Sequence, residues 1–375
     1  MRKGDIINGY TILEDFKVTG GMSMVSFAKK NGKEYFIKEF LSPKYPTPDS
    51  PGSERIKEQK RKSCDVFEKH HRDLNTAIEK CVGKGGNLIY ALDFFRFGAS
   101  YYKITEKVDV SSLSTSEISK LPIKSILLIA KSAAHSIGIL HKEKIVHGDL
   151  KPDNLLIKKK SDTVYVTKLI DFDDSYFESR PPEDKDNLVG TPEYYSPEQA
   201  SYIMDEDDEV EGSVLTCKSD IFSLGIIFTE YFTGTKPIIT GDYKSIWNCV
   251  QNKGSVSFKG SLVPDVERLL RRMLSLRPAD RPTINEVLSA LKNVDITSKG
   301  RHHEGGTTLR IGRGFGPTIK PISYGEGKAL AKDTKTTHDS PIKTPTKTEG
   351  EPVKDVKDIK MINHLRGKGM DIASK

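Results

Sequence analysis

The first part of the chain alternates apolar and polar residues with a period near two, the pattern of half-buried β-strands. Within residues 9–40 the alternation falls into three runs, over residues 10–18, 24–31 and 33–40, with a glycine turn between the first two. A proline-rich loop follows at residues 42–53. These features predict that the chain begins with strands joined by turns.

The pattern then changes to the spacing of a helix. Residues 54–81 are mostly charged, with apolar residues recurring on one side, which predicts a long amphipathic helix. Its apolar positions include Val66, Phe67, Leu74, Ala77 and Ile78. Two further strand-like runs follow, at residues 87–98 and 100–110.

Helical patterns dominate the second part of the chain. We predict helices at residues 123–141, 220–234 and 265–276, and short strands at residues 155–159 and 163–170. Strands therefore come first and helices later, and we find no internal repeat. This order predicts an α+β fold with two lobes.

Composition narrows the class of protein. The chain has 375 residues, enough for two lobes and a large core, and 36% hydrophobic with 30% charged residues is typical of a globular chain. No uninterrupted apolar run approaches the ~20 residues of a membrane span, and the first residues do not resemble a signal peptide. We expect a soluble, cytoplasmic protein without a membrane partner or a clear nucleic-acid site. Four separated cysteines without a C-x-x-C motif fit a reducing compartment: Cys64, Cys81, Cys217 and Cys249.

The positive charge is concentrated at the end of the chain. From Gly300 onward, 15 Lys and Arg face 9 Asp and Glu, a net charge of +6 out of +7 for the whole chain. This segment is rich in Gly, Lys, Thr and Pro, so we expect a flexible extension that could bind a regulatory partner. Six acidic residues lie between Asp205 and Glu211. They form either a solvated loop or a surface that attracts basic substrates or the chain's own basic end.

Five motifs occur in an order that suits phosphoryl transfer. They are the glycine turn, a strand lysine at Lys38, HGDLKPDN at residues 147–154, DFD at 171–173 and GTPEYYSPE at 190–198. Transfer from a nucleotide needs backbone N–H groups and a cation for the phosphates, oxygen ligands for Mg²⁺ and a carboxylate near the acceptor hydroxyl. Over roughly residues 10–293 the chain resembles eukaryotic-type serine/threonine protein kinases, and its glycine turn is most similar to that of bacterial members.

The resemblance implies the protein kinase fold, a small β-rich lobe at residues 1–108 and a larger helical lobe at 109–298, followed by the basic extension at 299–375. It also implies ATP and Mg²⁺ as cofactors, and transfer of the γ-phosphate to Ser and Thr hydroxyls of proteins, autophosphorylation included.

The resemblance further implies the residues of the ATP site. Lys38 corresponds to the lysine that contacts the α- and β-phosphates. In the link between the lobes, Glu106 would supply a carbonyl, and Val108 an N–H and a carbonyl, to the adenine. The expected nucleotide-binding residues are Val18, Gly20, Gly21, Val25, Lys38, Glu106, Val108 and Leu156.

The loop motifs supply the expected catalytic and metal-binding groups. Asp149 resembles the catalytic carboxylate, and Lys151 would reach the γ-phosphate; lysine at this position favours Ser or Thr as the acceptor. Asn154 and Asp171 would bind Mg²⁺, a cation that prefers oxygen ligands.

Family kinases hold the strand lysine with a glutamate on a helix. The candidate here is Glu68, which we count among the expected catalytic residues. Glu58, Asp73 and Glu79 lie on the same predicted helix, and the spacing does not decide between them.

Other matches have structural roles in the family. His147 would pack against Phe172, Glu198 would form a buried ion pair with Arg281, and Asp220 would hold the catalytic loop through backbone hydrogen bonds. Thr191 would form a hydrogen bond near the catalytic aspartate.

Departures from the family pattern motivate an alternative, a catalytically dead scaffold that binds partners through the basic extension. They are Ser23, Phe36, Gly148 and Asp173. A small-molecule kinase is a third possibility, but residues 190–198 match a peptide-docking segment. Gly148 stands where many family members have an arginine that binds the activating phosphate. We therefore expect activity that does not depend on phosphorylation of the segment from Asp171 to Glu198.

Overall fold

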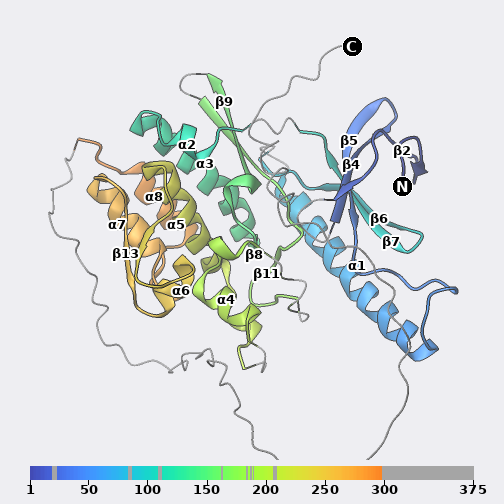
Figure 1. Cartoon of the computed structure of the whole chain (residues 1–375). Coiled ribbons are helices and arrows are strands. Elements are labelled where there is room, and N and C mark those ends of the chain that lie inside the picture. The colour runs from blue at the N-terminus through green and yellow to red at the C-terminus, as the bar shows by residue number, and fades with distance from the viewer. Residues whose placement is uncertain are drawn as a thin grey trace, which may run out of the picture. The chain divides into compact units, whose positions relative to one another are not determined.

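The computed structural model describes residues 1–18, 23–82, 87–108, 112–161, 164–182, 185, 188, 190–205 and 209–297. It shows the predicted α+β arrangement, a strand-rich lobe followed by a helical lobe (Figure 1). Gly20 and Gly21 of the glycine turn and the extension at 299–375 lie outside the described residues.

The strand-rich lobe is an antiparallel sheet in the order β1-β2-β4-β5-β7-β6, with β3 paired to β4. Its strands are β1 (Ile6–Ile7), β2 (Tyr10–Ile12), β3 (Lys17–Val18), β4 (Ser23–Lys30), β5 (Lys33–Phe40), β6 (Ala91–Phe97) and β7 (Ser100–Glu106). The predicted strand-like runs at residues 24–31, 33–40, 87–98 and 100–110 correspond to β4, β5, β6 and β7, whereas the run at residues 10–18 is divided into β2 and β3. Strand β1 is an addition that the alternation did not indicate. The register places Lys38 of β5 opposite Val25 of β4 on one side and Lys103 of β7 on the other.

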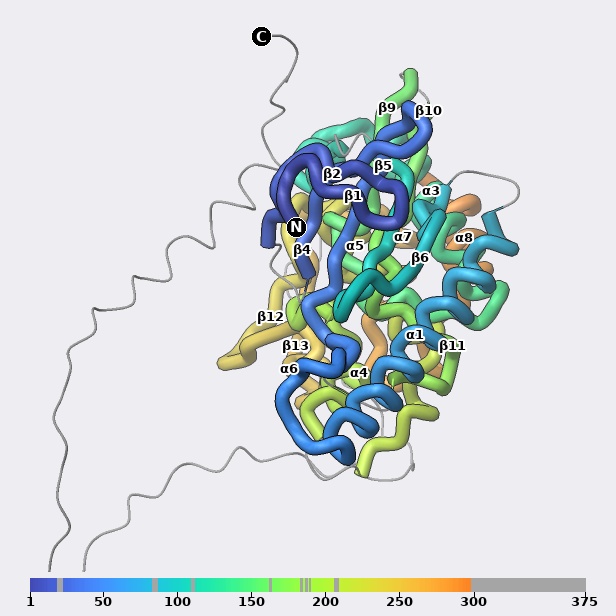
Figure 2. The backbone as a smooth tube through the Cα atoms, turned by 90° about the vertical axis from the view of Figure 1, so that its right-hand side faces the viewer, coloured from blue at the N-terminus to red at the C-terminus, as the bar shows by residue number. Residues whose placement is uncertain are grey.

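The predicted amphipathic helix is confirmed as α1 (Glu54–Val82). It contacts β6 and, in the second lobe, α3 (Ile123–Lys142), so it lies between the sheet and the helices (Figures 1 and 2). The α1 residues that face inward include Cys64, His71, Leu74 and Ile78. The expected apolar position Val66 is instead 68% exposed.

The second lobe is built mainly of helices. Besides α3 these are α2 (Thr115–Ile118), α4 (Pro197–Ile203), α5 (Cys217–Thr233), α6 (Ile246–Gln251), α7 (Pro264–Met273) and α8 (Ile284–Lys292). Short 3₁₀ turns occur at Pro152–Asn154, Pro192–Tyr194, Gly212–Val214 and Pro278–Asp280. Three two-stranded sheets complete this lobe, formed by β8 (Ile145–Val146) with β11 (Tyr176–Phe177), β9 (Leu155–Ser161) with β10 (Val164–Leu169), and β12 (Ile238–Thr240) with β13 (Ser255–Ser257).

The centre of the helical lobe is α3. Within the described part of the chain, α3 alone is long and apolar enough to cross a membrane by length and composition. Half of its most apolar window is buried, and it packs against α5, α8 and β10. We therefore interpret α3 as the core helix of this lobe.

Strand pairing in the second lobe gathers the predicted loop motifs. The pair β8–β11 joins Val146 to Tyr176, and the hairpin β9–β10 lies between them in the sequence. The loop after β8 therefore starts where the loop after β10 ends, at the β8–β11 pair. It ends where the loop after β10 starts, at the β9–β10 hairpin. This brings HGDLKPDN and DFD together.

Candidate active site

The predicted catalytic loop forms one hydrogen-bonded group. Lys151 Nζ donates to Asp149 Oδ2 at 2.6 Å and to Thr191 Oγ1 at 2.9 Å. Asn154 Nδ2 donates to the Asp149 backbone oxygen at 2.7 Å and to Asp149 Oδ2 at 3.2 Å. Three residues predicted to act together therefore lie together, and Thr191 lies beside them as expected.

One oxygen of this group has no partner. Asp149 Oδ1 is buried and accepts no hydrogen bond from any described residue. Leaving a buried acceptor unpaired costs about 1–3 kcal/mol, so such atoms need an explanation. Lys151 and Asn154 fix this carboxylate through its other oxygen, Oδ2. The unpaired Oδ1 is therefore suited to receive a proton from an incoming hydroxyl.

A buried carboxylate holds the backbone of the loop. Asp220 accepts hydrogen bonds from the His147 N–H at 2.8 Å and the Gly148 N–H at 3.2 Å, and lies 2.9 Å from His141 Nε2. The predicted role of Asp220 is thus confirmed. The His147 ring lies 5.4 Å from the Phe172 ring, centroid to centroid, which confirms the predicted packing.

The predicted ion pair between Glu198 and Arg281 is also confirmed. Arg281 donates two hydrogen bonds to the carboxylate, at 2.6 and 2.8 Å, and its side chain is fully buried. Its remaining donors reach the backbone oxygens of Lys218, Ser275 and Leu276. The pair attaches residues 190–198 to the region between α7 and α8.

Gly148 has a packing role that the sequence did not reveal. Its φ is +83°, and a Cβ at this position would lie 2.2 Å from the backbone oxygen of Asp174. The next residue, Ser175, is buried and donates from Oγ to the His147 oxygen at 2.9 Å. A residue with a side chain could not occupy position 148 without moving the segment after DFD.

Lys38 contacts two carboxylates of the DFD motif. Its Nζ donates to Asp171 Oδ1 at 3.1 Å and makes a close hydrogen bond to Asp173 Oδ2. Lys103 of β7 makes a similar close bond to Asp173 Oδ1 and lies 3.7 Å from Asp171. Burial alone would lower the pKa of Lys38, but the charges of Asp171 and Asp173 raise it, so the ammonium is protonated.

The electrostatics of Asp173 follow from the same contacts. Burial would raise its pKa, yet the Lys103 and Lys38 ammonium groups lower it well below the usual range. For Asp174, one residue further, burial together with the charges of Asp149, Asp171 and Asp173 raises the pKa to about 7. The charge of Lys38 acts to lower this pKa, but it is outweighed.

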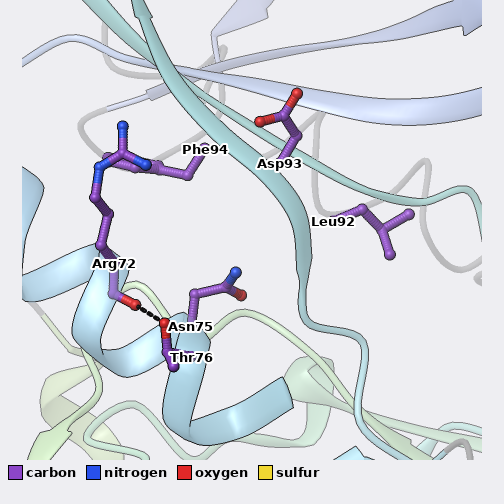
Figure 3. Close-up of a pocket in the computed structure, with 6 residues that line it drawn as sticks. All are labelled: Arg72, Asn75, Thr76, Leu92, Asp93 and Phe94. Atoms are coloured by element: carbon purple, nitrogen blue, oxygen red, sulfur yellow. Dashed lines mark hydrogen bonds between the residues drawn. The ribbon is translucent and has the colours of Figure 1, made fainter. Parts of the chain in front are cut away.

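The predicted pair of Lys38 with Glu68 is not formed. The Glu68 carboxylate instead accepts from Arg72 Nε and Nη2 at 2.9 and 2.8 Å. Arg72 lies at a pocket between α1 and β6 (Figure 3). The pocket has a volume of about 310 Å³, and the Arg72 guanidinium lies 5.8 Å from the centre of the Phe94 ring. Two of the alternatives are likewise paired on α1, Glu58 with Arg61 at 3.0 Å and Asp73 with Lys69 at 2.6 Å.

On α1, His71 lines a small cavity together with Lys103 and Asp173. Its ring lies 4.3 Å from the Phe67 ring and 5.1 Å from those of Phe40 and Phe94. Burial lowers the pKa of His71 to about 3, although the charge of Asp173 acts in the opposite direction. The helix therefore presents a neutral imidazole at this point.

Sequence reasoning missed Lys103 and His71. The alternation of SYYKITE could have indicated Lys103, because residues two apart in a strand share a face, which places Tyr101, Lys103 and Thr105 on one side of the strand. His71 follows Phe67 by four residues and precedes Leu74 by three, which is the spacing of one helix face.

The remaining nucleotide-site candidates lie on the elements that their positions predicted. Val25 on β4 is opposite Lys38, and Leu156 on β9 is buried. Glu106 ends β7, with Val108 two residues beyond, and Val18 at the end of β3 is 59% exposed. Phe36, one of the departures, packs its ring 6.1 Å from that of Phe27.

The two predicted metal ligands fit a magnesium ion that is also bound by a nucleotide. Asn154 uses its Nδ2 for the contacts with Asp149, and no described residue donates to its Oδ1. The Asp171 side chain is 40% exposed. No cluster of three or more His, Cys, Asp or Glu that could hold a metal occurs in the described ranges. Mg²⁺ needs no such cluster, because it is commonly bound by one or two protein oxygens together with phosphates and waters.

Comparison with known proteins identifies one family. The family described as protein kinase domain matches residues 55–291. Similar proteins include mitogen-activated protein kinase kinase 1 of Arabidopsis thaliana, 29% identical over 49% of this chain and 51% of that protein. The serine/threonine-protein kinases PknA of Corynebacterium glutamicum and pkn3 of Myxococcus xanthus are 29% and 30% identical, over 47% and 46% of this chain and 35% and 31% of theirs.

The extent of these matches matters for the site. The chain spans between about a third and a half of the length of these relatives. The family match begins after β5, so it includes residues 147–154, 171–173 and 190–198 but not Lys38. The position of Lys38 beside DFD is a finding of the structure.

Proposed function

This chain belongs to the protein kinase family, and from that premise we propose that it transfers the γ-phosphate of ATP to Ser and Thr hydroxyls of proteins, its own included. The observation that carries the proposal is the group formed by Asp149, Lys151, Asn154 and Thr191, with Asp149 Oδ1 unpaired. Relatives named as serine/threonine kinases support the choice of acceptor.

The proposed reaction assigns a role to each loop residue. The acceptor hydroxyl donates its hydrogen bond to Asp149 Oδ1, its oxygen forms a bond to the γ-phosphorus, and the bond from that phosphorus to the β–γ bridging oxygen breaks. The hydroxyl proton passes to Asp149, and ADP leaves. Lys151, 2.6 Å from Asp149 Oδ2, neutralises charge that develops on the transferred group.

The nucleotide would lie between the two lobes. We assign Lys38 to the α- and β-phosphates, the backbones of Glu106 and Val108 to the adenine edge, and Val25 and Leu156 to the faces of the base. Val18, Gly20 and Gly21 remain the candidates for covering the phosphates. Bound Mg²⁺ would supply positive charge between the phosphate oxygens, and Asn154 Oδ1 and Asp171 are the oxygens that would hold it.

A protein acceptor is supported by the segment at residues 190–198. Thr191 is fixed to Lys151 at 2.9 Å, and Glu198 is anchored by Arg281. A hydroxyl held at one end and a buried ion pair at the other give this segment a defined path beside Asp149. Such a path is suited to align an extended peptide.

The direct test is phosphoryl transfer from γ-labelled ATP with Mg²⁺ to the protein itself and to a mixed Ser/Thr peptide library, with phosphoamino-acid analysis. Asp149→Asn should lower the rate by about a thousandfold or more, since it removes the proton acceptor and keeps the shape. Asp153→Asn, an exposed aspartate of the same loop, is the matched control and should leave the rate unchanged. If the parent binds ATP but transfers nothing, the alternative of a dead scaffold replaces this proposal.

We also propose that the basic extension at residues 299–375 binds a regulatory partner or substrate. The support is its composition, which carries nearly all the net charge and few large apolar residues. Deleting residues 300–375 should change substrate choice while the melting temperature stays within about 2 °C. A much larger fall in melting temperature would instead assign the extension to the folded core.

A further inference from the structure

Two lysines of the sheet lie opposite each other with their side chains almost buried. β5 and β7 are antiparallel neighbours, and their register pairs Lys38 with Lys103. The exposed fractions of the two side chains are 13% and 10%. Like charges directly opposite on neighbouring strands repel each other, and buried charges are costly unless they are paired. The pair therefore requires a carboxylate between the two ammonium groups.

Asp173 provides that carboxylate. Its Oδ2 accepts from Lys38 and its Oδ1 from Lys103, so one side chain bridges both strands, and it is only 15% exposed. Asp171 adds a second negative charge, 3.1 Å from Lys38 and 3.7 Å from Lys103. The cluster thus contains two cations and two anions, with a net charge of zero. Asp173 stands where the family pattern has glycine, and its bridging contacts give that departure a reason.

The neighbouring helix adds no charge to the cluster. His71 lines the same small cavity as Lys103 and Asp173, and among its own ring contacts are Phe40, Phe67 and Phe94. Glu68, on the flank of the inward stripe of α1, binds Arg72. In protein kinases the strand lysine is held by a helix glutamate, whose position controls activity. Here the structure supplies a different partner for the lysine.

We propose that Asp173 and Lys103 are positioning residues that orient Lys38 for the phosphates of ATP, in place of a carboxylate on α1. This inference rests on the proposed function, since it concerns the same nucleotide site. Asp173 sets the direction of the Lys38 ammonium, and Lys103 neutralises Asp173 so that Lys38 remains able to attract phosphate oxygens. The orientation of Lys38 is thereby set by a carboxylate of the DFD segment and not by a carboxylate of α1.

Single substitutions should separate kcat from KM, because each changes the charge of the cluster differently. Asp173→Asn leaves a net charge of +1, so the KM for ATP should stay the same or fall while kcat falls about tenfold or more, since Lys38 is no longer directed. Lys103→Met leaves a net charge of −1, so the KM for ATP should rise about tenfold. The double variant, again neutral, should return KM towards that of the parent while kcat stays low.

A relocated carboxylate provides the rescue experiment. In the Asp173→Asn background, His71→Glu places a carboxylate on α1 at the wall of the same cavity. It should restore kcat several-fold, an effect that a merely structural role of Asp173 would not produce. Glu58→Gln, which breaks an exposed ion pair with Arg61 on the same helix, is the matched control and should leave kcat and KM unchanged.

Each measurement is paired with calorimetric titration of Mg²⁺·ADP and a melting curve, so that folding and nucleotide binding are followed apart from transfer. If Asp173→Asn raises kcat, Asp173 blocks Lys38 and the proposal is wrong. If Glu68→Gln lowers kcat as much as Asp173→Asn does, a helix carboxylate is the partner after all. If the parent transfers no phosphate, the proposed function fails, whereas the ordering of nucleotide affinities among the variants still supports or overturns the charge balance proposed for the cluster.

Discussion

The two sides of the candidate site differ in how closely they follow the family pattern. On the side of the helical lobe, Lys151 and Asn154 both donate to Asp149, and Asp220 and Arg281 make the contacts predicted for them. On the side of the sheet, the lysine is in place but its partner is not the predicted one. Lys38 contacts Asp171 and Asp173, and Asp173 also binds Lys103, whereas Glu68 binds Arg72.

The difference shows where the spacing of residues in the sequence is sufficient to predict their contacts. The loop residues lie within six positions of one another, so their separation in sequence limits their arrangement in space. The partner of Lys38 depends instead on which face of the 29-residue α1 is turned inward. Phe67, His71, Leu74 and Ile78 recur at steps of four, three and four and form the inward stripe. Glu68 follows Phe67 directly, so it is turned by about 100° from Phe67 and lies on the flank of that stripe.

The largest effect should come from breaking the anchor on the loop side. Arg281→Met leaves the carboxylate of Glu198 buried without a cation, which should lower the free energy of unfolding by about 3–5 kcal/mol. Urea denaturation of the parent and variant measures the change.

The control for this anchor is Arg277→Met. Arg277 pairs with Asp280, but both side chains are largely exposed, at 66% and 45%, so the loss should stay below about 1 kcal/mol. Equal effects of the two substitutions would mean that burial does not distinguish the two ion pairs, and the loop side would lose its proposed anchor.

A smaller, pH-dependent effect should come from Asp174, which lies between the two sides. Its pKa of about 7 in the folded protein exceeds the value of about 3.9 for an exposed aspartate. Between these values the folded state binds more protons than the unfolded state, so stability falls as pH rises from about 4 to 7. Asp174→Asn removes this loss, and its melting temperature should exceed that of the parent by a margin that grows from pH 5 to pH 8.

The measurement for Asp174 is a series of melting curves at pH 5, 6, 7 and 8 without nucleotide or Mg²⁺. Asp153→Asn, which removes an exposed carboxylate of the neighbouring loop, is the control for the loss of one negative charge. If the difference in melting temperature between Asp174→Asn and the parent does not change with pH, the pKa of Asp174 is not raised in the folded protein. The segment after DFD would then be less closely packed on Gly148 than the structure indicates.

The smallest effect on activity is expected for Ser175 and Ser179. Ser175 Oγ is buried and bound to the His147 oxygen, and Ser179 Oγ donates to the Ser213 oxygen at 3.2 Å. Gly148 provides no charge for a phosphate here. The double variant Ser175→Ala/Ser179→Ala should therefore keep activity within about threefold of the parent, with about 1–2 kcal/mol lower stability from the lost hydrogen bonds. If the double variant is inactive and phosphatase treatment also inactivates the parent, phosphorylation of the segment from Asp171 to Glu198 controls activity.

By itself, the sequence determined the order of strands and helices, the two lobes and the loop chemistry. Alternation and helical spacing indicate local structure, and the residues of HGDLKPDN and DFD are close enough in the chain for their spacing to limit their geometry. It also indicated the Glu198–Arg281 pair through the resemblance to kinases. Only the tertiary structure decided what holds Lys38. The register of β5 against β7 placed Lys103 opposite it, and packing of the inward stripe of α1 left Glu68 on its flank, where it binds Arg72. Both depend on the packing of segments far apart in the chain, which no local pattern specifies.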